Sequence, residues 1–383
     1  MRKNLIAVAV LAAVAPLAGA QTTMGNVTIF GLIDVNVTHY SGGSNSNAAG
    51  TGAVPSRTAM EDGTVNGLNG SRWGVRVAEP ISGDLTVGAW LESGFLVDTG
   101  QSAQQGRLFG RQAFLYVNSK TWGELRAGRQ YVFADEILPP GNPFANALLF
   151  NPTTSVTNNG RSVATMIDAP RADNVIRYRT PDFAGFWAGA MFAPHENATA
   201  TFGAQSPVDS YYGFAAAYNK TPLFLGVAYE YNDQRSTGNE INKSLSLSAK
   251  WDFGFARLMG NYQKVDDMAI SANGHAGNQL LNRVIGQGSR TITLQNQDGY
   301  LVGAEIPWQA FTFGLGYTRI KYEGTPSAAG LPSSYTLGKS VAGVKYDLSK
   351  RTFLYADFSF ANGDLSDYIS QEKQYQVGMQ HRF

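Results

Sequence analysis

The chain contains no cysteine in 383 residues, and it has only four histidines, at positions 39, 195, 275 and 381. A chain without thiols can form neither a disulfide scaffold nor a thiolate metal site. No two histidines are close together in the sequence. The sequence therefore predicts no metal site and no bound cofactor.

Charge is also scarce. Charged residues make up 15% of the chain, and 30 Lys and Arg nearly balance 29 Asp and Glu. This balance provides no overall field that would attract nucleic acid, which we do not expect as a partner. After residue 20 there is also no apolar run near the ~20 residues that a transmembrane helix needs.

Residues 1–20 have the pattern of a secretion signal. Arg2 and Lys3 precede an apolar run from Leu5 to Leu17, and the small residues Ala18 to Ala20 form a cleavage site. The alternative is a membrane anchor, which would need a longer apolar run of ~20 residues. We expect the signal to be removed, so that an exported mature chain begins at Gln21.

What the sequence does contain is alternation with a period of two, together with 43 glycines and 12% aromatic residues. The final segment is typical. Tyr375, Val377, Met379 and Phe383 fall on one face of a strand, and Gln374, Gln376, Gly378, Gln380 and Arg382 fall on the other. Strands with one apolar and one polar face form the walls of transmembrane barrels.

Sixteen such segments follow one another along the chain. Their approximate bounds are 26–39, 70–79, 83–97, 109–118, 122–131, 172–180, 184–193, 209–219, 222–232, 241–252, 254–266, 294–306, 309–322, 337–348, 351–362 and 372–383. Tight turns alternate with long polar connections, of which the first is 40–69 and the third is 132–171. An even number of strands lets the first and last strands pair, which leaves no open edge in lipid.

The pattern predicts an all-β fold: a sixteen-stranded antiparallel transmembrane β-barrel with short periplasmic turns and long outer loops. It forms one domain, residues 21–383. The alternative is a soluble all-β sandwich or a β-helix. A sandwich of this length would need two domains and a linker, and the composition shows no break after residue 21.

Several motifs carry a family resemblance. They include NVTIFGLIDVNVTHY (26–40), SRWGVRV (71–77), LFGRQAFLYV (108–117), GELRAGRQY (123–131), DNVIRYRTPDFAGF (173–186) and the final HRF (381–383). In order and spacing, these motifs resemble the general diffusion porins of Gram-negative bacteria, most closely the trimeric sixteen-stranded type of Burkholderia- and Neisseria-like bacteria. The resemblance runs from about residue 26 to 383. It departs from the family pattern at residues 77–84, in one short turn.

The resemblance implies a passive channel for ions and small hydrophilic solutes in the outer membrane. It also implies a homotrimer, contacts with outer-membrane lipid and lipopolysaccharide, and a third long loop that folds inward. It further implies that Phe383 is an assembly signal read by the barrel-insertion machinery.

Residues 132–171 have a composition that supports the inward-folded loop. They contain apolar side chains that need a surface to pack against, namely Phe133, Ile137, Leu138, Phe144, Leu148, Leu149 and Phe150. Long loops with such content are usually functional. We therefore expect this segment to constrict the pore; an external cap or a trimer contact is the alternative.

Arginines crowd into four of the first six predicted strands. Alternation directs Arg72, Arg76 and Arg126 inward, and it places Arg177 and Arg179 on a shared face. For Arg111 and Arg129 the periodicity is ambiguous, and the family motifs FGRQ and GRQY place them on the pore wall. Asp135 and Glu136 at the root of the loop, with Asp34 and Glu92 on the wall, are the expected acidic partners.

We therefore expect a charged constriction made by Arg72, Arg76, Arg111, Arg126, Arg129, Asp135 and Glu136. Opposed fixed charges in a narrow lumen set ion preference, and the arginines favour a weak preference for anions. The alternative for each arginine is a salt bridge at the rim or a contact with lipopolysaccharide.

Two other functions are weaker alternatives. A substrate-specific outer-membrane channel often has a continuous aromatic track, but the inward aromatic residues Phe30, Trp90 and Tyr355 are scattered along the sequence. A barrel enzyme would need an activated serine with a histidine and an orienting group, and no such motif occurs. We expect a channel and no enzyme. Five tryptophans, at 73, 122, 187, 251 and 308, are expected in aromatic girdles at the membrane interfaces.

Overall fold

The structure is a computed structural model. It describes residues 26–41, 56–64, 67–144, 157–158, 161–162, 171–194, 210–233, 242–267, 284–287, 290–326, 330, 332–363 and 372–383. The predicted signal at 1–20 lies outside the described residues, as do residues 145–156, 159–160 and 163–170 of the third long loop.

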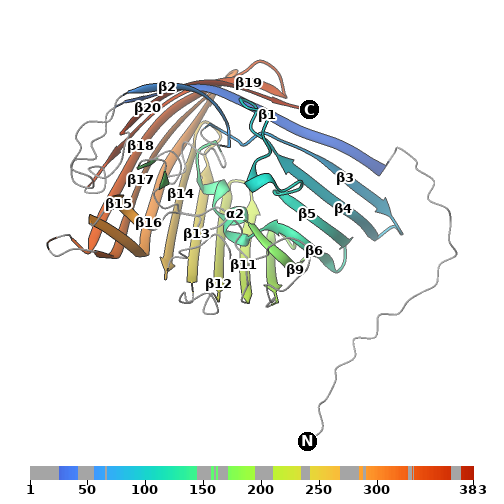
Figure 1. The fold of residues 1–383 in the computed structure, drawn as a ribbon. Helices are drawn as coiled ribbons and strands as arrows, with labels where there is room; N and C mark the ends of the chain where they lie inside the picture. The colour runs from blue at the N-terminus through green and yellow to red at the C-terminus, as the bar shows by residue number, and fades with distance from the viewer. Residues whose placement is uncertain are drawn as a thin grey trace, which may run out of the picture.

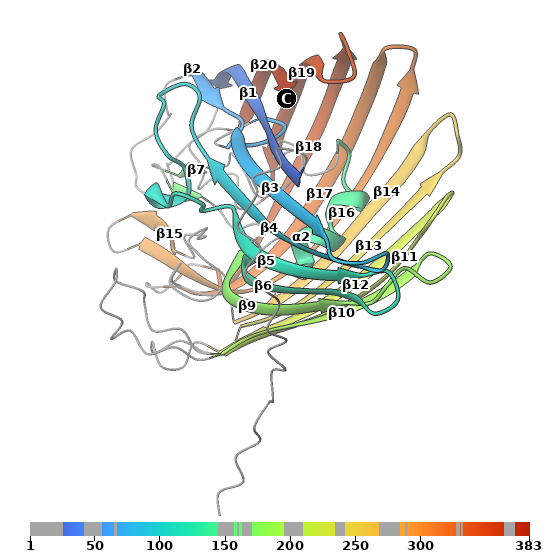
Figure 2. The same ribbon diagram turned by 90° about the vertical axis from the view of Figure 1, so that its right-hand side faces the viewer.

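Within the described residues, sixteen strands form a closed antiparallel barrel (Figures 1 and 2). They are β1 (Val27–Ser41), β3 (Arg72–Pro80), β4 (Leu85–Gly94), β5 (Gln112–Ser119), β6 (Gly123–Tyr131), β9 (Arg171–Arg179), β10 (Phe186–Ala193), β11 (Tyr211–Lys220), β12 (Leu223–Asn232), β13 (Asn242–Asp252), β14 (Arg257–Asp266), β16 (Arg290–Trp308), β17 (Phe311–Pro326), β18 (Ser334–Asp347), β19 (Thr352–Asn362) and β20 (Lys373–Arg382). Each matches one of the sixteen predicted segments, and the predicted fold class is confirmed.

The first and last strands close the barrel, as the sequence predicted. β1 pairs with β20 from Leu32 opposite Arg382 to Ser41 opposite Lys373. Beyond this ladder, Gly31 and Phe383 exchange two backbone hydrogen bonds of 3.1 and 3.0 Å. Antiparallel pairing at this seam removes the open edge that lipid could not satisfy.

Four further strands lie in the predicted long connections: β2 (Arg57–Asp62), β7 (Thr157–Asn158), β8 (Arg161–Ser162) and β15 (Val284–Gln287). The sequence pattern gave 40–69 as one long polar connection and did not predict β2 within it. β1 pairs with β3 only from Val27 to Leu32, and β2 takes over from Val35 to Tyr40. β1 extends beyond the end of β3, so the backbone N–H and C=O groups of this extension need another partner strand. This need for pairing places β2 here and does not depend on an apolar pattern in β2.

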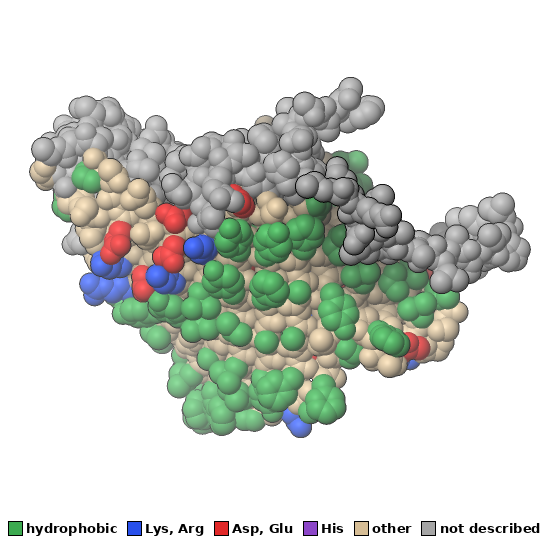
Figure 3. Space-filling model, turned by 90° about the horizontal axis from the view of Figure 1, so that it is seen from below, with side chains coloured by type: hydrophobic (Ala, Val, Ile, Leu, Met, Phe, Trp, Pro, Cys, Tyr) green, Lys and Arg blue, Asp and Glu red, His purple; other side chains and the backbone are tan. Residues whose placement is uncertain are grey.

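Side-chain burial alternates along the strands, as expected for a barrel wall. In β20, Gln374, Gln376 and Gln380 are buried on the inner face, whereas Tyr375 and Val377 are exposed on the outer face. Figure 3 shows apolar side chains spread over the visible wall, with charged side chains gathered in a patch at one side of it. Among the described residues, no helix is long and apolar enough to cross a membrane.

The tryptophans divide into two groups. Trp73, Trp122, Trp251 and Trp308 are exposed on the outer wall or in turns, where an aromatic girdle is expected. Trp187 was wrongly assigned to this girdle. It faces inward from β10 and is buried beneath Phe133, with the ring centres 6.1 Å apart.

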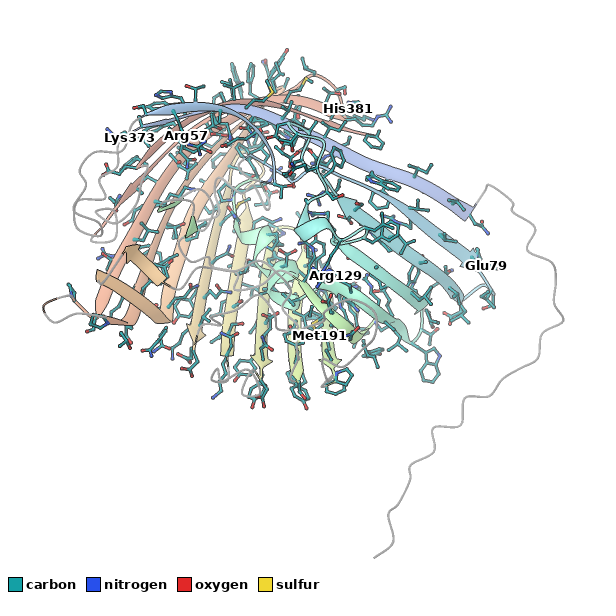
Figure 4. The ribbon with its side chains drawn as sticks, in the orientation of Figure 1. Arg57, Glu79, Arg129, Met191, Lys373 and His381 are labelled. Atoms are coloured by element: carbon teal, nitrogen blue, oxygen red, sulfur yellow. The ribbon has the colours of Figure 1, made fainter. Side chains whose placement is uncertain are left out.

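The beginning of the third long loop folds into the barrel. It contains α2 (Phe133–Ile137) and the short 3-10 turn η3 (Pro139–Gly141), and α2 lies within the ring of strands in Figures 1 and 2. The apolar residues of this segment pack on the inner faces of β9 to β12, in a cluster that includes Met191 (Figure 4). The prediction of an inward-folded third loop is confirmed for its described part.

Candidate pore constriction

Small residues in the wall let α2 lie flat on the barrel. A Cβ added at Gly189 would approach the Phe133 ring to 2.6 Å, and one added at Gly226 would approach Ile137 to 2.9 Å. Glu230 of β12 then accepts a hydrogen bond of 3.0 Å from the backbone N–H of Ala134, at the start of the helix. Packing and this hydrogen bond together fix α2 against one side of the lumen.

On the strands β3 to β5, two arginines share one buried carboxylate. Arg111 Nε lies 2.5 Å from Glu92 Oε1, and Arg72 Nη1 lies 3.7 Å from the same oxygen. Gln112 and Trp90 donate to the other carboxylate oxygen, at 2.9 and 3.0 Å. Both carboxylate oxygens of Glu92 therefore have partners, and Glu92 holds both guanidiniums at the wall.

A third guanidinium joins this group through Tyr131, which ends β6. The Tyr131 hydroxyl accepts hydrogen bonds from Arg111 at 2.5 Å and from Arg171 at 2.9 Å. The Arg171 guanidinium also lies 4.5 Å from the centre of the Tyr131 ring. We call Arg72, Arg111 and Arg171 the arginine cluster; among the described residues, its three positive charges have one ion-paired carboxylate, Glu92.

Asp135 on α2 is the acidic group that the loop turns toward this cluster. Burial raises the pKa of Asp135 to about 7, although the positive charges of Arg171, Arg111 and Arg72 act against this shift. The side chain keeps part of its surface open to the lumen. Its charge therefore changes near neutral pH.

Glu136, the next residue of α2, is paired with the wall. Arg177 Nη2 donates to Glu136 Oε2, and Arg179 Nε lies 3.9 Å from Glu136 Oε1. The guanidinium of Arg177 also lies 4.8 Å from the centre of the Phe133 ring. These pairs tie the loop to β9 and compensate the charge of Glu136.

Arg129 belongs to a separate ion-pair group at the ends of β6 and β9 (Figure 4). It pairs with Asp173, which also accepts from Arg107 Nη1 at 2.8 Å. Its Nε donates to the carbonyl oxygen of Gly110 at 2.7 Å. Two arginines thus share Asp173, so the negative charge of Asp173 compensates part of the positive charge of Arg129.

Arg76 and Arg126 lie nearer to the short turns. In the β3–β4 ladder, Arg72 is opposite Gly94 and Arg76 is opposite Trp90, four residues and roughly 13 Å further along the strand. Arg126 Nε pairs with Glu124 Oε1 at 2.6 Å. The structure therefore does not bring these two arginines together with the arginine cluster.

Asp34, the other acidic residue expected on the wall, points inward but is covered. It is fully buried and accepts hydrogen bonds from the Tyr355 hydroxyl at 2.6 Å and from the backbone N–H of Asn69 at 2.9 Å. Leu68 packs beside it against β18 and β19. Asp34 therefore anchors the end of the first long connection and lies apart from α2.

Sequence reasoning missed Arg171, Asp173 and Tyr131. All three lie where β6 and β9 pass a register shift, between Gly128 and Gln130, and Asn174 there has a φ of 58°. Such a bulge breaks the alternation on which the inward assignment depends. The available signal was the string RAD at 171–173, which follows the loop and whose Asp173 is the first residue of the quoted motif DNVIRYRTPDFAGF.

Within the described part of the chain, no group of three or more His, Asp and Glu side chains could hold a metal ion. The two described histidines contact threonines: His39 Nδ1 lies 2.9 Å from Thr58 Oγ1, and His381 Nδ1 lies 2.8 Å from Thr352 Oγ1. The chemistry of the lumen is thus that of fixed charges, amides and aromatic rings.

Comparisons with known proteins agree with this architecture. A family model described as Gram-negative porin matches residues 7–366. An outer membrane porin protein of Bordetella pertussis is 29% identical over 409 residues, covering 100% of both chains. Outer membrane porin protein 32 of Delftia acidovorans is 31% identical over 381 residues, covering 99% of this chain and 95% of its own.

Among solved structures, an anion-selective porin from Comamonas acidovorans is similar, with a TM-score of 0.64 and 25% sequence identity. The match covers 93% of this chain and 99% of that chain. The family match spans most of the sequence, and both relatives are matched over nearly their full length. The chain therefore belongs to the Gram-negative porin family.

Proposed function

We propose that this porin is a passive channel for ions and small hydrophilic solutes, with a constriction that weakly prefers anions. The observation that carries the preference is the arginine cluster, in which three guanidiniums have, among the described residues, one ion-paired carboxylate, Glu92, bound by Arg72 and Arg111. Charges in a confined lumen lie within about a Debye length, roughly 8 Å at physiological salt, of a passing ion. The excess of positive charge therefore attracts anions to the narrow section.

The constriction itself is the space between the arginine cluster and α2. Two facts support this assignment: α2 is held to the inner wall by packing and by Glu230, and Asp135 on α2 interacts electrostatically with all three arginines. Of the residues expected from the sequence, Arg72, Arg111, Asp135 and Glu136 contribute directly. Arg129 contributes a compensated charge.

The test is the reversal potential of single channels in planar bilayers that separate two KCl concentrations. We expect a potential of the sign that indicates chloride preference, and a larger one at low salt because screening is weaker there. A potential of the opposite sign would overturn the anion preference. An absence of conductance from inserted, folded protein would overturn the channel function.

A channel is favoured over a barrel enzyme by the contacts of His39 and His381. Each imidazole contacts a threonine hydroxyl, and both contacts are exposed. Neither contact involves the carboxylate that orients a catalytic histidine. His195 and His275 lie outside the described residues. A substrate-specific channel is the second candidate, and the contacts among the inward aromatic residues Phe30, Trp90 and Phe114 favour it.

We further propose a homotrimer in contact with outer-membrane lipid and lipopolysaccharide, with Phe383 as a signal for the barrel-insertion machinery. The exposed apolar wall supports contact with lipid. Extracted protein should migrate as a compact oligomer without heating and shift to the monomer on boiling. Migration as a monomer in mild detergent would contradict the trimer.

A further inference from the structure

Three inward-facing aromatic residues contact one another between the arginine cluster and the short turns, and one of them, Phe114, is buried. Phe30 of β1 lies edge-on to Trp90 of β4, with ring centres 5.1 Å apart. Trp90 in turn stacks with Phe114 of β5 at 6.2 Å, with 20° between the ring planes. We call Phe30, Trp90 and Phe114 the aromatic shelf. The interpretation of the inward aromatic residues as scattered was therefore wrong for Phe30 and Trp90.

Two guanidiniums lie over the shelf. Arg76 Cζ is 3.8 Å from the centre of the Trp90 ring, and Arg126 Cζ is 4.8 Å from the centre of the Phe114 ring. A guanidinium stacked on an aromatic face is held in a defined plane. The N–H donors at the edge of such a guanidinium can bind a ligand where no protein group accepts from them.

The two arginines differ in their acidic partners. Arg126 pairs with Glu124, whereas among the described residues Arg76 has no carboxylate within ion-pair distance. Arg76 is also exposed to the lumen. Its planar fork of donors matches the geometry of a carboxylate, which it can bind through two parallel hydrogen bonds.

We propose that the aromatic shelf with Arg76 and Arg126 is a binding site for planar aromatic carboxylates that traverse this channel. The carboxylate binds the free donors of Arg76, and the ring lies against the guanidinium and indole surface. This inference rests on the proposed channel function and adds a selectivity that the arginine cluster alone does not provide. Charge attracts every small anion, but only a flat π system gains from stacking.

A pair of matched anions separates stacking from charge. Benzoate and cyclohexanecarboxylate have the same charge and similar size, but only benzoate is planar. Each is added to KCl on the short-turn side of single wild-type channels, and the concentration that halves the current is measured. We expect benzoate to block at a concentration about threefold to tenfold lower than cyclohexanecarboxylate, as stacking energies of this kind allow.

Variants of the shelf should remove this preference in distinct ways. Arg76→Lys keeps the charge but loses the plane, so the two anions should block almost equally. Trp90→Leu should do the same, whereas Trp90→Phe keeps a ring and should retain most of the preference. Lys345→Gln is the matched control, because Lys345 lies on β18, three strands from β1 around the wall, and 5.0 Å from the Phe353 ring; it should leave the preference unchanged.

Equal block by the two anions in wild-type channels of normal KCl conductance would overturn the shelf and leave the channel function intact. Retention of the preference in both Arg76→Lys and Trp90→Leu would also overturn it. A wild-type protein that inserts but does not conduct KCl would overturn the proposed function and this inference with it.

Discussion

At the scale of single residues, the charge that an ion meets depends on which guanidiniums already have a partner. Arg107 and Arg129 share Asp173, and Arg177 is paired with Glu136. Among the described residues, Arg72 and Arg111 form ion pairs with Glu92 alone, and Arg171 donates to the Tyr131 hydroxyl. The number of arginines in a strand therefore says less about ion preference than the balance within each small group.

We predict that the double variant Arg72→Gln, Arg171→Gln moves the reversal potential toward cations, most strongly at low salt. This pair of substitutions leaves Arg111 bound to Glu92, so no buried carboxylate loses its closest partner. The measurement is the reversal potential in a KCl gradient at two ionic strengths.

Arg129→Gln is the matched control. Asp173 keeps its ion pair with Arg107 in this variant, and the change in local net charge is smaller than in the double variant. If Arg129→Gln shifted the potential as much as the double variant, the place of Arg129 in the constriction, as expected from the sequence, would be correct instead.

A second prediction concerns pH. Because burial raises the pKa of Asp135 to about 7, this carboxyl is neutral below that pH and charged above it. Lowering the pH from 8 to 6 should remove negative charge from the constriction, so anion preference should increase. The reversal potential of wild type and of Asp135→Asn should be measured over this range.

Asp135→Asn should show the low-pH selectivity at both pH values. Glu230 faces the same helix and is retained in both proteins, so a pH response that survives in Asp135→Asn would assign the titration to another group.

At the scale of secondary-structure elements, the alternating pattern identified all sixteen barrel strands. It succeeded because each strand must present an apolar face to lipid and a polar face to water, which fixes a period of two. It failed for β2, whose position depends on the unpaired outer half of β1. It was also ambiguous at Arg111 and Arg129, which lie just before β5 and beside the register shift of β6.

The interior was harder to predict than the wall. The apolar content of 132–171 predicted that the loop packs against another surface. In the structure, its described part packs on the inner faces of β9 to β12. Which strands supply the seat depends on small residues such as Gly189 and Gly226, and nothing in the local sequence marks them as contacts of Phe133 and Ile137. The partners of the wall arginines, Asp173 above all, likewise depend on pairing between distant segments.

The seat of α2 leads to a third prediction. Phe133→Ala removes a fully buried ring, which should cost about 3–5 kcal/mol of free energy. The loss should weaken the packing of the loop on the wall. The barrel ladders do not involve this side chain, so we expect assembly to persist while α2 becomes mobile. Single-channel recordings should show increased current noise and more frequent partial closures.

Phe253→Ala is a suitable control, since Phe253 is exposed in a tight turn. If the current noise of Phe133→Ala channels matched that of the control, the loop would be held in place without the packing of Phe133.

At the scale of the whole molecule, closure of the sheet depends on the seam between β1 and β20. Phe383 extends this seam by two backbone hydrogen bonds to Gly31, each worth about 0.5–1.5 kcal/mol. Its ring lies over Gly31, where an added Cβ would approach the ring to 2.4 Å and the carbonyl oxygen of Arg72 to 2.6 Å. The final residue thus fits a position that only glycine leaves open.

We predict that Gly31→Ala and deletion of Phe383 both lower the amount of assembled protein in the outer membrane. The added methyl group must displace the Phe383 ring or the β3 backbone, and the deletion removes the hydrogen bonds. Gly83→Ala is the control, because no atom lies within 4 Å of its added Cβ. Heat-modifiable protein in outer-membrane fractions is the measurement.

Channels that do assemble from the truncated chain should keep the wild-type reversal potential, because the deletion removes no side chain of the arginine cluster. Wild-type levels of the truncated protein would contradict a role of Phe383 in assembly.

The seat of α2 on β9 to β12 has a consequence for how such channels can diverge. The helix that folds into the lumen rests mainly on one arc of the wall, whereas two of the three arginines in the cluster come from the arc around β3 to β5. Substitutions in the first arc would alter the size of solute that fits, and substitutions in the second would alter the sign of ion that is preferred. Aperture and polarity are therefore largely separate traits, which mutation can adjust one at a time.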